Sequence, residues 1–225
     1  MIEYNLEAVD IQKHIYGEKN LKTAVSYHNI AYAYNDCRNY EKAVEYYLKA
    51  IDIETSINGE TQDSVAISYA TLATTYENLG QNEAAIECRL KATEIKRSIY
   101  GKTHLDVANA YQCLANLHDR LRNYEKAIDY HSKALNIYRF IHGDKHEETA
   151  KSCRLVAFAL QMVKDYQKAI KYNQKARDVY NFLLRTNSSS SEKMTSLQDQ
   201  LVQVNQRLRD CQKTLDSHVE TRNLP

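Results

Sequence analysis

Histidine and cysteine are the side chains of this 225-residue chain with the greatest potential for metal binding or catalysis. His142 and His146 lie four residues apart, the spacing of two zinc ligands on one helical turn, but Gly143 separates them at an expected helix break. The five cysteines form no CxxC pair, so we expect free and mostly buried thiols in a reducing compartment. The glycines stand singly and form no phosphate-binding loop. We therefore expect no catalytic residue, metal site or cofactor, and predict that the chain is not an enzyme.

Small residues recur at a fixed interval of 42 residues, and this interval indicates the architecture. Four of the five glycines follow it, namely Gly17, Gly59, Gly101 and Gly143. Alanines keep the same interval in several columns, one of which is Ala31, Ala73, Ala115 and Ala157. A period of 20–50 residues is typical of an array in which each supersecondary unit packs on the next copy. The chain is therefore expected to be an array of repeats.

Each repeat carries two successive segments with helical spacing of apolar residues. In the first full repeat these segments are residues 24–34 and 40–53, in which small and aromatic residues fall at steps of three and four. The polar junctions 36–39 and 121–123 are so short that they allow only antiparallel helical hairpins. Each glycine of the 42-residue column follows the second segment, so we expect it to end that helix in the left-handed conformation. These patterns predict an all-α protein.

Columns of small and aromatic residues on paired helices resemble the tetratricopeptide repeat family, whose usual repeat has 34 residues. This chain is similar to the long, 42-residue form of that family. Its junctions at 101–108 and 134–150 resemble those of kinesin light chain, nephrocystin-3 and the clustered-mitochondria protein. The resemblance covers residues 1–187. It implies a right-handed superhelical solenoid whose concave groove is lined by the first helix of each repeat and binds protein ligands.

The repeat period also predicts the segments of the chain. We expect a half repeat at 1–17, full repeats at about 18–59, 60–101, 102–143 and 144–187, a serine linker at 188–191, an amphipathic helix at 192–217 and a frayed tail at 218–225. Residues 2–15 match the second helix of a repeat whose first helix is absent. Either a fragment of a longer protein or a natural start with a half repeat would give this pattern.

The C-terminal helix carries an apolar stripe that alternates steps of three and four. Its members are Met194, Leu197, Leu201, Val204, Leu208, Cys211 and Leu215. Two interpretations fit this stripe. The helix either caps the last hairpin or forms a dimeric coiled coil through residues 194–215.

The groove is expected to be lined by residues one step away from the packed face of each first helix. These are His28, Asn29, Tyr32, Asn35, Thr71, Thr74, Asn78, Asn109, Gln112, Asn116, Arg120, Lys151, Arg154 and Phe158. Their amides and hydroxyls can bond an extended peptide backbone, and Tyr32 and Phe158 offer apolar anchors. Lys151 and Arg154 would suit an acidic side chain or a terminal carboxylate of the partner.

Charge and hydropathy limit the classes of partner that the protein is expected to bind and the compartment in which it is expected to lie. The formal net charge is +1, which gives no general attraction for nucleic acid, although residues 146–187 hold eight basic against four acidic residues. The sequence has no long apolar run and no signal peptide, so we expect a cytoplasmic protein without membrane contact. The leading hypothesis is a noncatalytic scaffold that binds a partner peptide, with an acidic segment as one option. The alternatives are a homodimer through 194–215 and, more weakly, an RNA-associated domain suggested by the clustered-mitochondria resemblance.

Overall fold

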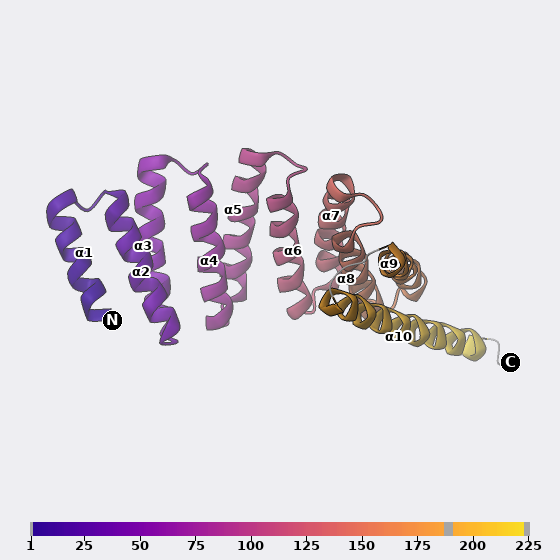
Figure 1. Cartoon of the computed structure of the whole chain (residues 1–225). Coiled ribbons are helices and arrows are strands. Elements are labelled where there is room, and N and C mark those ends of the chain that lie inside the picture. Colours follow the sequence, from indigo (N-terminus) through magenta and orange to yellow (C-terminus); the bar gives the residue numbers. More distant parts are fainter. Residues whose placement is uncertain (1, 187–190, 223–225) are drawn as a thin grey trace. The chain divides into compact units, whose positions relative to one another are not determined.

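The computed structural model describes residues 2–186 and 191–222, with side chains described for 2–186 and 192–217. All secondary structure in the described ranges is α-helical (Figure 1), which confirms the predicted fold class. The chain divides into two compact units, residues 1–101 and residues 102–225.

Unit 1 is a stack of antiparallel helices that pack in chain order. The helices are α1 (Ile2–Tyr16), α2 (Leu21–Asp36), α3 (Tyr40–Asn58), α4 (Asp63–Leu79) and α5 (Asn82–Tyr100). The hairpins are α2 with α3 and α4 with α5, while α1 packs on α2 and α3 packs on α4. These helices correspond to the half repeat and the first two full repeats of the sequence pattern.

Unit 2 repeats this arrangement and adds a long terminal helix. It contains α6 (Leu105–Arg120), α7 (Tyr124–His142), α8 (Glu147–Met162), α9 (Tyr166–Thr186) and α10 (Ser191–Arg222). The hairpins are α6 with α7 and α8 with α9; α7 packs on α8, and α10 packs on α9. The last helix thus contacts the second helix of the last repeat, as the first helix of a further repeat would.

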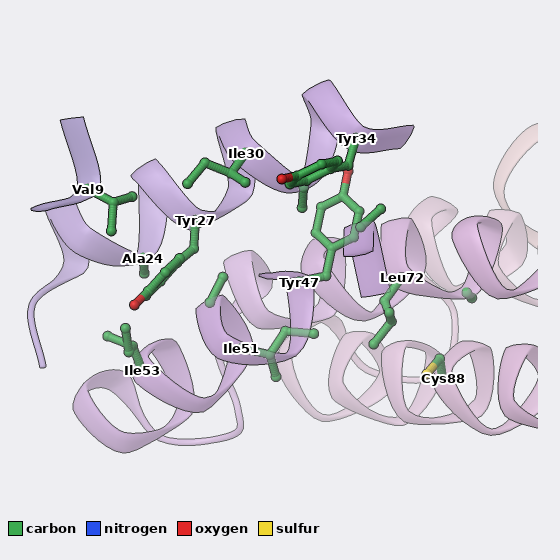
Figure 2. Close-up of a cluster of buried hydrophobic side chains, with 14 residues drawn as sticks. Val9, Ala24, Tyr27, Ile30, Tyr34, Tyr47, Ile51, Ile53, Leu72 and Cys88 are labelled. Atoms are coloured by element: carbon green, nitrogen blue, oxygen red, sulfur yellow. The ribbon is translucent and has the colours of Figure 1, made fainter. Parts of the chain in front are cut away.

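The core of unit 1 runs through each of its helices without interruption. Figure 2 shows Val9 of α1, Tyr27 of α2, Ile53 of α3, Leu72 of α4 and Cys88 of α5 among the side chains of one buried cluster. Alanines are completely buried where neighbouring helices approach, because close approach leaves no room for a larger side chain. These alanines are Ala31, Ala43, Ala50, Ala66, Ala73 and Ala85.

The glycines that follow the second helices differ from the prediction in one backbone angle. Gly59 (φ 76°, ψ 170°) and Gly143 (φ 83°, ψ 174°) have the expected positive φ, but their ψ is extended and not left-handed helical. This region is open essentially to glycine alone. The glycine carbonyl is turned toward the next hairpin, where the Thr149 hydroxyl donates a hydrogen bond of 2.8 Å to the Gly143 oxygen. Thr23 makes the same bond to Gly17 at 2.9 Å.

The left-handed helical conformation occurs at the end of the first helices. Gly80 (φ 80°, ψ 7°) ends α4 in this way. The corresponding residues of the other repeats, Arg38, Arg122 and Lys164, also have positive φ, between 56° and 64°. The repeat therefore requires a left-handed residue at the turn inside each hairpin, although only one repeat has glycine there.

The C-terminal helix uses its apolar stripe inside unit 2. Leu197, Val204 and Cys211 are at most 1% exposed and belong to the same buried cluster as Tyr180 of α9. Helix α10 thus packs as a cap on the last hairpin, with these three residues of the stripe buried and its other members partly buried. It begins at Ser191 and continues beyond residue 217 to Arg222. The rest of the predicted serine linker, 188–190, and the end of the predicted tail, 223–225, lie outside the described residues.

Two further expectations concern the helices and the thiols. None of the described helices is both long and apolar enough to cross a membrane. The five cysteines are free; Cys88, Cys153 and Cys211 are buried, whereas Cys37 and Cys113 are exposed. The expectation of mostly buried thiols therefore holds for three of them.

Candidate functional site

The predicted groove residues lie on two surfaces, one in each unit. In unit 1, α2 and α4 carry the seven residues that we call the unit 1 surface: His28, Asn29, Tyr32, Asn35, Thr71, Thr74 and Asn78. Five of them are exposed, and Tyr32 exposes 60% of its surface. His28 and Asn35 are half-buried because they take part in hydrogen bonds between helices.

His28 lies in a network that joins α2, α3 and α4. Its Nε2 atom is 3.0 Å from Glu54 Oε1 and 3.1 Å from Ser68 Oγ. The Ser68 hydroxyl also donates to Glu54 Oε2 at 2.7 Å, and both Glu54 and Ser68 are buried. The structure thus places Nε2 of His28 in an internal network, where this atom is not available to a ligand. The sequence pattern did not reveal Glu54 or Ser68, since the repeat period carries no signal for a pair of polar residues from different repeats.

Serine, histidine and glutamate are also the residue types of a hydrolytic triad. In such a triad one imidazole nitrogen faces the nucleophile and the other faces the acid, so that the base can carry the proton. Here the same Nε2 atom of His28 faces both Ser68 and Glu54. Ser68 also donates directly to Glu54 and is only 4% exposed. This geometry stabilises the packing of three helices and does not activate the serine.

A second set of bonds holds the other end of the unit 1 surface. The Thr75 hydroxyl of α4 donates to Asn35 Oδ1 of α2 at 3.4 Å, which ties the two first helices together. Arg89 of α5 donates from Nε to Glu77 at 2.6 Å and from Nη2 to Thr74 Oγ1 at 3.3 Å. The unit 1 surface is therefore braced by the second helices behind it.

The exposed threonines offer less hydrogen-bonding capacity than the sequence suggested. The Thr71 hydroxyl donates to the backbone oxygen of Ile67 at 3.0 Å, and Thr74 donates to that of Ala70 at 3.2 Å. Their protons are used within α4, so these side chains present acceptor lone pairs and methyl groups to a ligand. Donors on this surface come from the exposed amides of Asn29 and Asn78.

In unit 2, several of the predicted groove residues likewise bond to side chains of neighbouring helices. The Tyr138 hydroxyl donates to Asn109 Oδ1 at 2.6 Å, and burial raises the pKa of Tyr138 to about 12, so the proton stays on the phenol. Gln112 Nε2 lies 3.4 Å from Nδ1 of the fully buried His131, whose Nε2 is 2.8 Å from Asp119. Asn116 and Arg120 are exposed on the same helix, α6.

The groove residues of the last repeat contact the C-terminal helix. Arg154 Nη1 of α8 donates to Gln203 Oε1 of α10 at 2.9 Å, and the Arg207 guanidinium lies 5.3 Å from the centre of the Phe158 ring. Burial, together with the nearby charge of Arg154, lowers the pKa of Arg207. Helix α10 therefore occupies the place that the sequence assigned to a partner's acidic or apolar groups.

Lys151, the other predicted acid-binding cation, is paired within its own helix. Its Nζ atom lies 2.9 Å from both Glu147 and Glu148. Burial disfavours the charged form, but the hydrogen bonds to the two carboxylates outweigh it and raise the pKa of Lys151.

The histidines considered for a metal site stack on each other. The rings of His142 and His146 lie 4.2 Å apart and nearly parallel, and His146 Nδ1 accepts the backbone N–H of Glu148. Within the part of the chain that the structure describes, no group of three or more His, Cys, Asp and Glu side chains is arranged to hold a metal ion.

A comparison of the sequence with models of protein families identifies the type of repeat. The tetratricopeptide repeat model matches three overlapping stretches, residues 23–98, 64–139 and 106–181. The chain belongs to the tetratricopeptide repeat family. Its members are generally protein interaction modules and are typically noncatalytic. No curated protein matches the sequence.

Solved structures share the fold at low sequence identity. A putative kinesin light chain from Podosopora anserina with nearly identical tetratricopeptide-like repeats superposes with a TM-score of 0.70 at 20% identity, over 84% of this chain and 88% of that one. BtubC (BKLC) from P. vanneervenii gives 0.64 at 16%, over 100% and 91%. The signal transduction ATPase PH0952 from Pyrococcus horikoshii, which has a tetratricopeptide repeat sensor, gives 0.62 at 20%, over 100% and 34%. At such identities these similarities show the fold alone.

Proposed function

We propose that this protein is a noncatalytic interaction module that binds an extended peptide segment of a partner protein on the unit 1 surface. The observation that carries the proposal is Tyr32, a large aromatic side chain that is 60% exposed beside exposed amides on a braced surface. Tyrosine is a favoured binding anchor because it offers a large rigid contact area with few rotatable bonds.

Exposed apolar residues extend this surface along both first helices. Val25 lies on the same face of α2 as Asn29 and Tyr32, at steps of four and three, and is 56% exposed. Ile67 holds the corresponding place on α4 and is 54% exposed. Each first helix of unit 1 thus presents an apolar group followed by polar ones. This alternation suits a peptide that bonds through its backbone and inserts occasional apolar side chains.

The bracing of the unit 1 surface supports tight binding by a small number of contacts. The bonds of His28 to α3 and of Thr74 to α5, together with the bond between Asn35 of α2 and Thr75 of α4, hold α2 and α4 in place before a ligand arrives. A surface that is already ordered loses less conformational entropy on binding. None of the seven residues is lysine or arginine, so an acidic partner segment is not part of this proposal.

Less evidence supports a ligand on the groove residues of unit 2, dimerisation through the C-terminal helix or an RNA-associated role. Arg154 and Phe158 contact α10, so a ligand on that part of unit 2 would compete with the chain's own helix. Dimerisation through 194–215 would use Leu197, Val204 and Cys211, which are buried in the cluster with Tyr180 of α9, and we do not propose it. An RNA-associated role would require basic residues beside exposed aromatic rings, and none of the seven residues of the unit 1 surface is lysine or arginine.

Selection of peptides from a random displayed library against the purified chain tests this proposal. Selected peptides should bind with a dissociation constant that rises at least tenfold in Tyr32→Ala, about 1.4 kcal/mol. Leu48→Ala is the matched control, since Leu48 is a 45% exposed apolar residue on the second helix α3. Fluorescence anisotropy of a labelled peptide measures both. A library that yields no binder, or binders that respond to Leu48→Ala and not to Tyr32→Ala, would contradict the proposal.

A further inference from the structure

Unit 2 contains a half-open cavity of about 430 Å³ that is lined by α7, α8, α9 and the junction between α7 and α8, apart from all of the predicted groove residues. Its walls include Leu135, Cys153, Tyr172, Val179 and Phe182, with Lys175 among its polar groups. Pockets that bind small molecules usually measure roughly 300–1,000 Å³ and combine apolar walls with a few convergent polar groups. Both the volume and the lining of this cavity are of that kind.

The cavity lies where the other repeats place a tyrosine ring. Cys153 ends a column whose other members are Tyr27, Tyr69 and Tyr111. In unit 1 the Tyr27 ring is 4% exposed, lies 5.9 Å from the ring of Tyr46 and points toward Ile53 (Figure 2). The counterparts of Tyr46 and Ile53 in the last repeat are Tyr172 and Val179, and both line the cavity. The small thiol therefore leaves open the space that an aromatic ring fills elsewhere.

A lysine beside that space also lacks the carboxylate partner that the corresponding lysines of the other repeats have. In three repeats a lysine lies near the column tyrosine and pairs with an acid four residues earlier, as Lys133 does with Asp129 at 2.6 Å and Lys91 with Glu87 at 3.2 Å. In the last repeat the lysine is Lys175, but the position four residues earlier is Lys171. Among the described residues no carboxylate lies within ion-pair distance of Lys175, and its Nζ atom is 5.3 Å from the centre of the Tyr172 ring.

The other charges at the cavity also favour a negatively charged ligand. Arg139 donates to Asp144 at 2.7 Å, so these two charges compensate each other. Lys145 Nζ lies 4.6 Å from the centre of the Phe182 ring and, like Lys175, makes no ion pair with a described residue. With Asp178 as the remaining acid in the lining, cations exceed carboxylates at this cavity. Burial raises the pKa of Cys153 to about 11, so its thiol stays neutral and adds no negative charge.

We propose that this cavity binds a small aromatic carboxylate. The ligand's aromatic ring fills the space that a tyrosine ring occupies in the other repeats and that Cys153 leaves open. Its carboxylate pairs with Lys175, in place of the acidic residue that pairs with the corresponding lysine in the other repeats. A ligand of this kind supplies both groups that the last repeat lacks. The site lies between α7, α8 and α9 of unit 2 and shares no residue with the unit 1 surface, so it is independent of peptide binding there.

Titration of the isotope-labelled protein with 4-hydroxyphenylacetate, followed by amide chemical shifts, tests this assignment. We expect saturable one-site binding with shifts centred on Cys153, Tyr172 and Val179. 4-Methylphenol, which keeps the ring and lacks the carboxylate, should bind at least tenfold more weakly. Absence of saturable shifts at about 10 mM ligand, or equal binding of the two compounds, would overturn the proposal.

Variants separate the cavity from nonspecific binding. Lys175→Gln should weaken binding of 4-hydroxyphenylacetate at least tenfold, and Cys153→Tyr should abolish it by filling the space with the column residue. Lys91→Gln is the matched control, because Lys91 belongs to a repeat that keeps both its tyrosine and its acid. Melting temperatures show whether each variant is folded. If Cys153→Tyr fails to fold, Lys175→Gln decides: binding equal to that of the original protein would refute the proposal.

Discussion

Glu77→Ala should destabilise the α4–α5 hairpin by about 3–5 kcal/mol, because it leaves a buried guanidinium without its carboxylate. The side chains of Glu77 and Arg89 are only 8% and 15% exposed, and Arg89 Nε donates to Glu77 at 2.6 Å. Native-state hydrogen exchange of the α4 and α5 amides measures this loss, since it reports the free energy of opening of each segment.

Two further variants show whether the loss comes from the charge that remains when Glu77 is removed. Glu83→Ala removes an exposed acid from α5 and should change the free energy of opening by less than about 0.5 kcal/mol. The double variant Glu77→Leu with Arg89→Met removes both charges and should lie close to the original protein, since a buried pair replaced by apolar residues is often neutral. A loss in the double variant as large as that in Glu77→Ala would show that the charge is not the cause.

The same pair bears on the proposed function. Arg89 also donates to Thr74 Oγ1 at 3.3 Å, so it holds one residue of the unit 1 surface. Glu77→Ala should therefore weaken peptide binding in addition to lowering stability, although neither Glu77 nor Arg89 is a proposed peptide contact.

Val204→Asp should destabilise unit 2 by about 3–5 kcal/mol. The substitution loses the burial of a valine, worth about 1.5–3 kcal/mol, and places a carboxylate in an apolar interface. Val204 is completely buried between α10 and the last hairpin. Val202→Asp makes the same chemical change at a site that is 63% exposed and should alter stability by less than about 0.5 kcal/mol. Urea unfolding of the two variants provides the comparison.

Light scattering on the same variants distinguishes a cap from a dimerisation helix. If α10 serves as a cap, the original protein and Val202→Asp are monomers, and Val204→Asp is a less stable monomer. A dimeric protein that Val204→Asp converts into a folded monomer, with no loss of melting temperature, would show instead that the apolar stripe joins two copies.

The helices were predictable because the same pattern of buried residues recurs in several repeats. The alanine columns place the buried faces of α2, α4, α6 and α8, the tyrosine columns support those of α2, α4 and α6, and the short junctions force the hairpins. The conformation of Gly59 and Gly143 was not predictable in full. A glycine after a helix indicates a positive φ but does not give the value of ψ: the Gly143 carbonyl accepts a bond from Thr149 of the next helix, whereas the corresponding residue after Gly59 is Val65, and both glycines have an extended ψ.

The candidate site was predictable only in its outline. Helical periodicity places Asn29, Tyr32 and Asn78 at exposed positions, as the structure has them. It gives no information on the partners of His28 or of Arg154, because Glu54, Ser68 and Gln203 lie on other helices whose register is set by packing. For the cavity a signal did exist: Cys153 and Lys171 both depart from their columns. The size and lining of the cavity, however, also depend on the side chains of α7 and α9.

Mapping a selected peptide onto the protein by amide chemical shifts tests most directly whether the first helices of unit 1 bind a peptide. Binding on the unit 1 surface predicts shifts, at saturating peptide, at Asn29, Tyr32, Thr71, Thr74 and Asn78, with Leu48 and Lys91 on the second helices unchanged. Shifts confined to α3 and α5, with α2 and α4 unaffected at saturation, would contradict it.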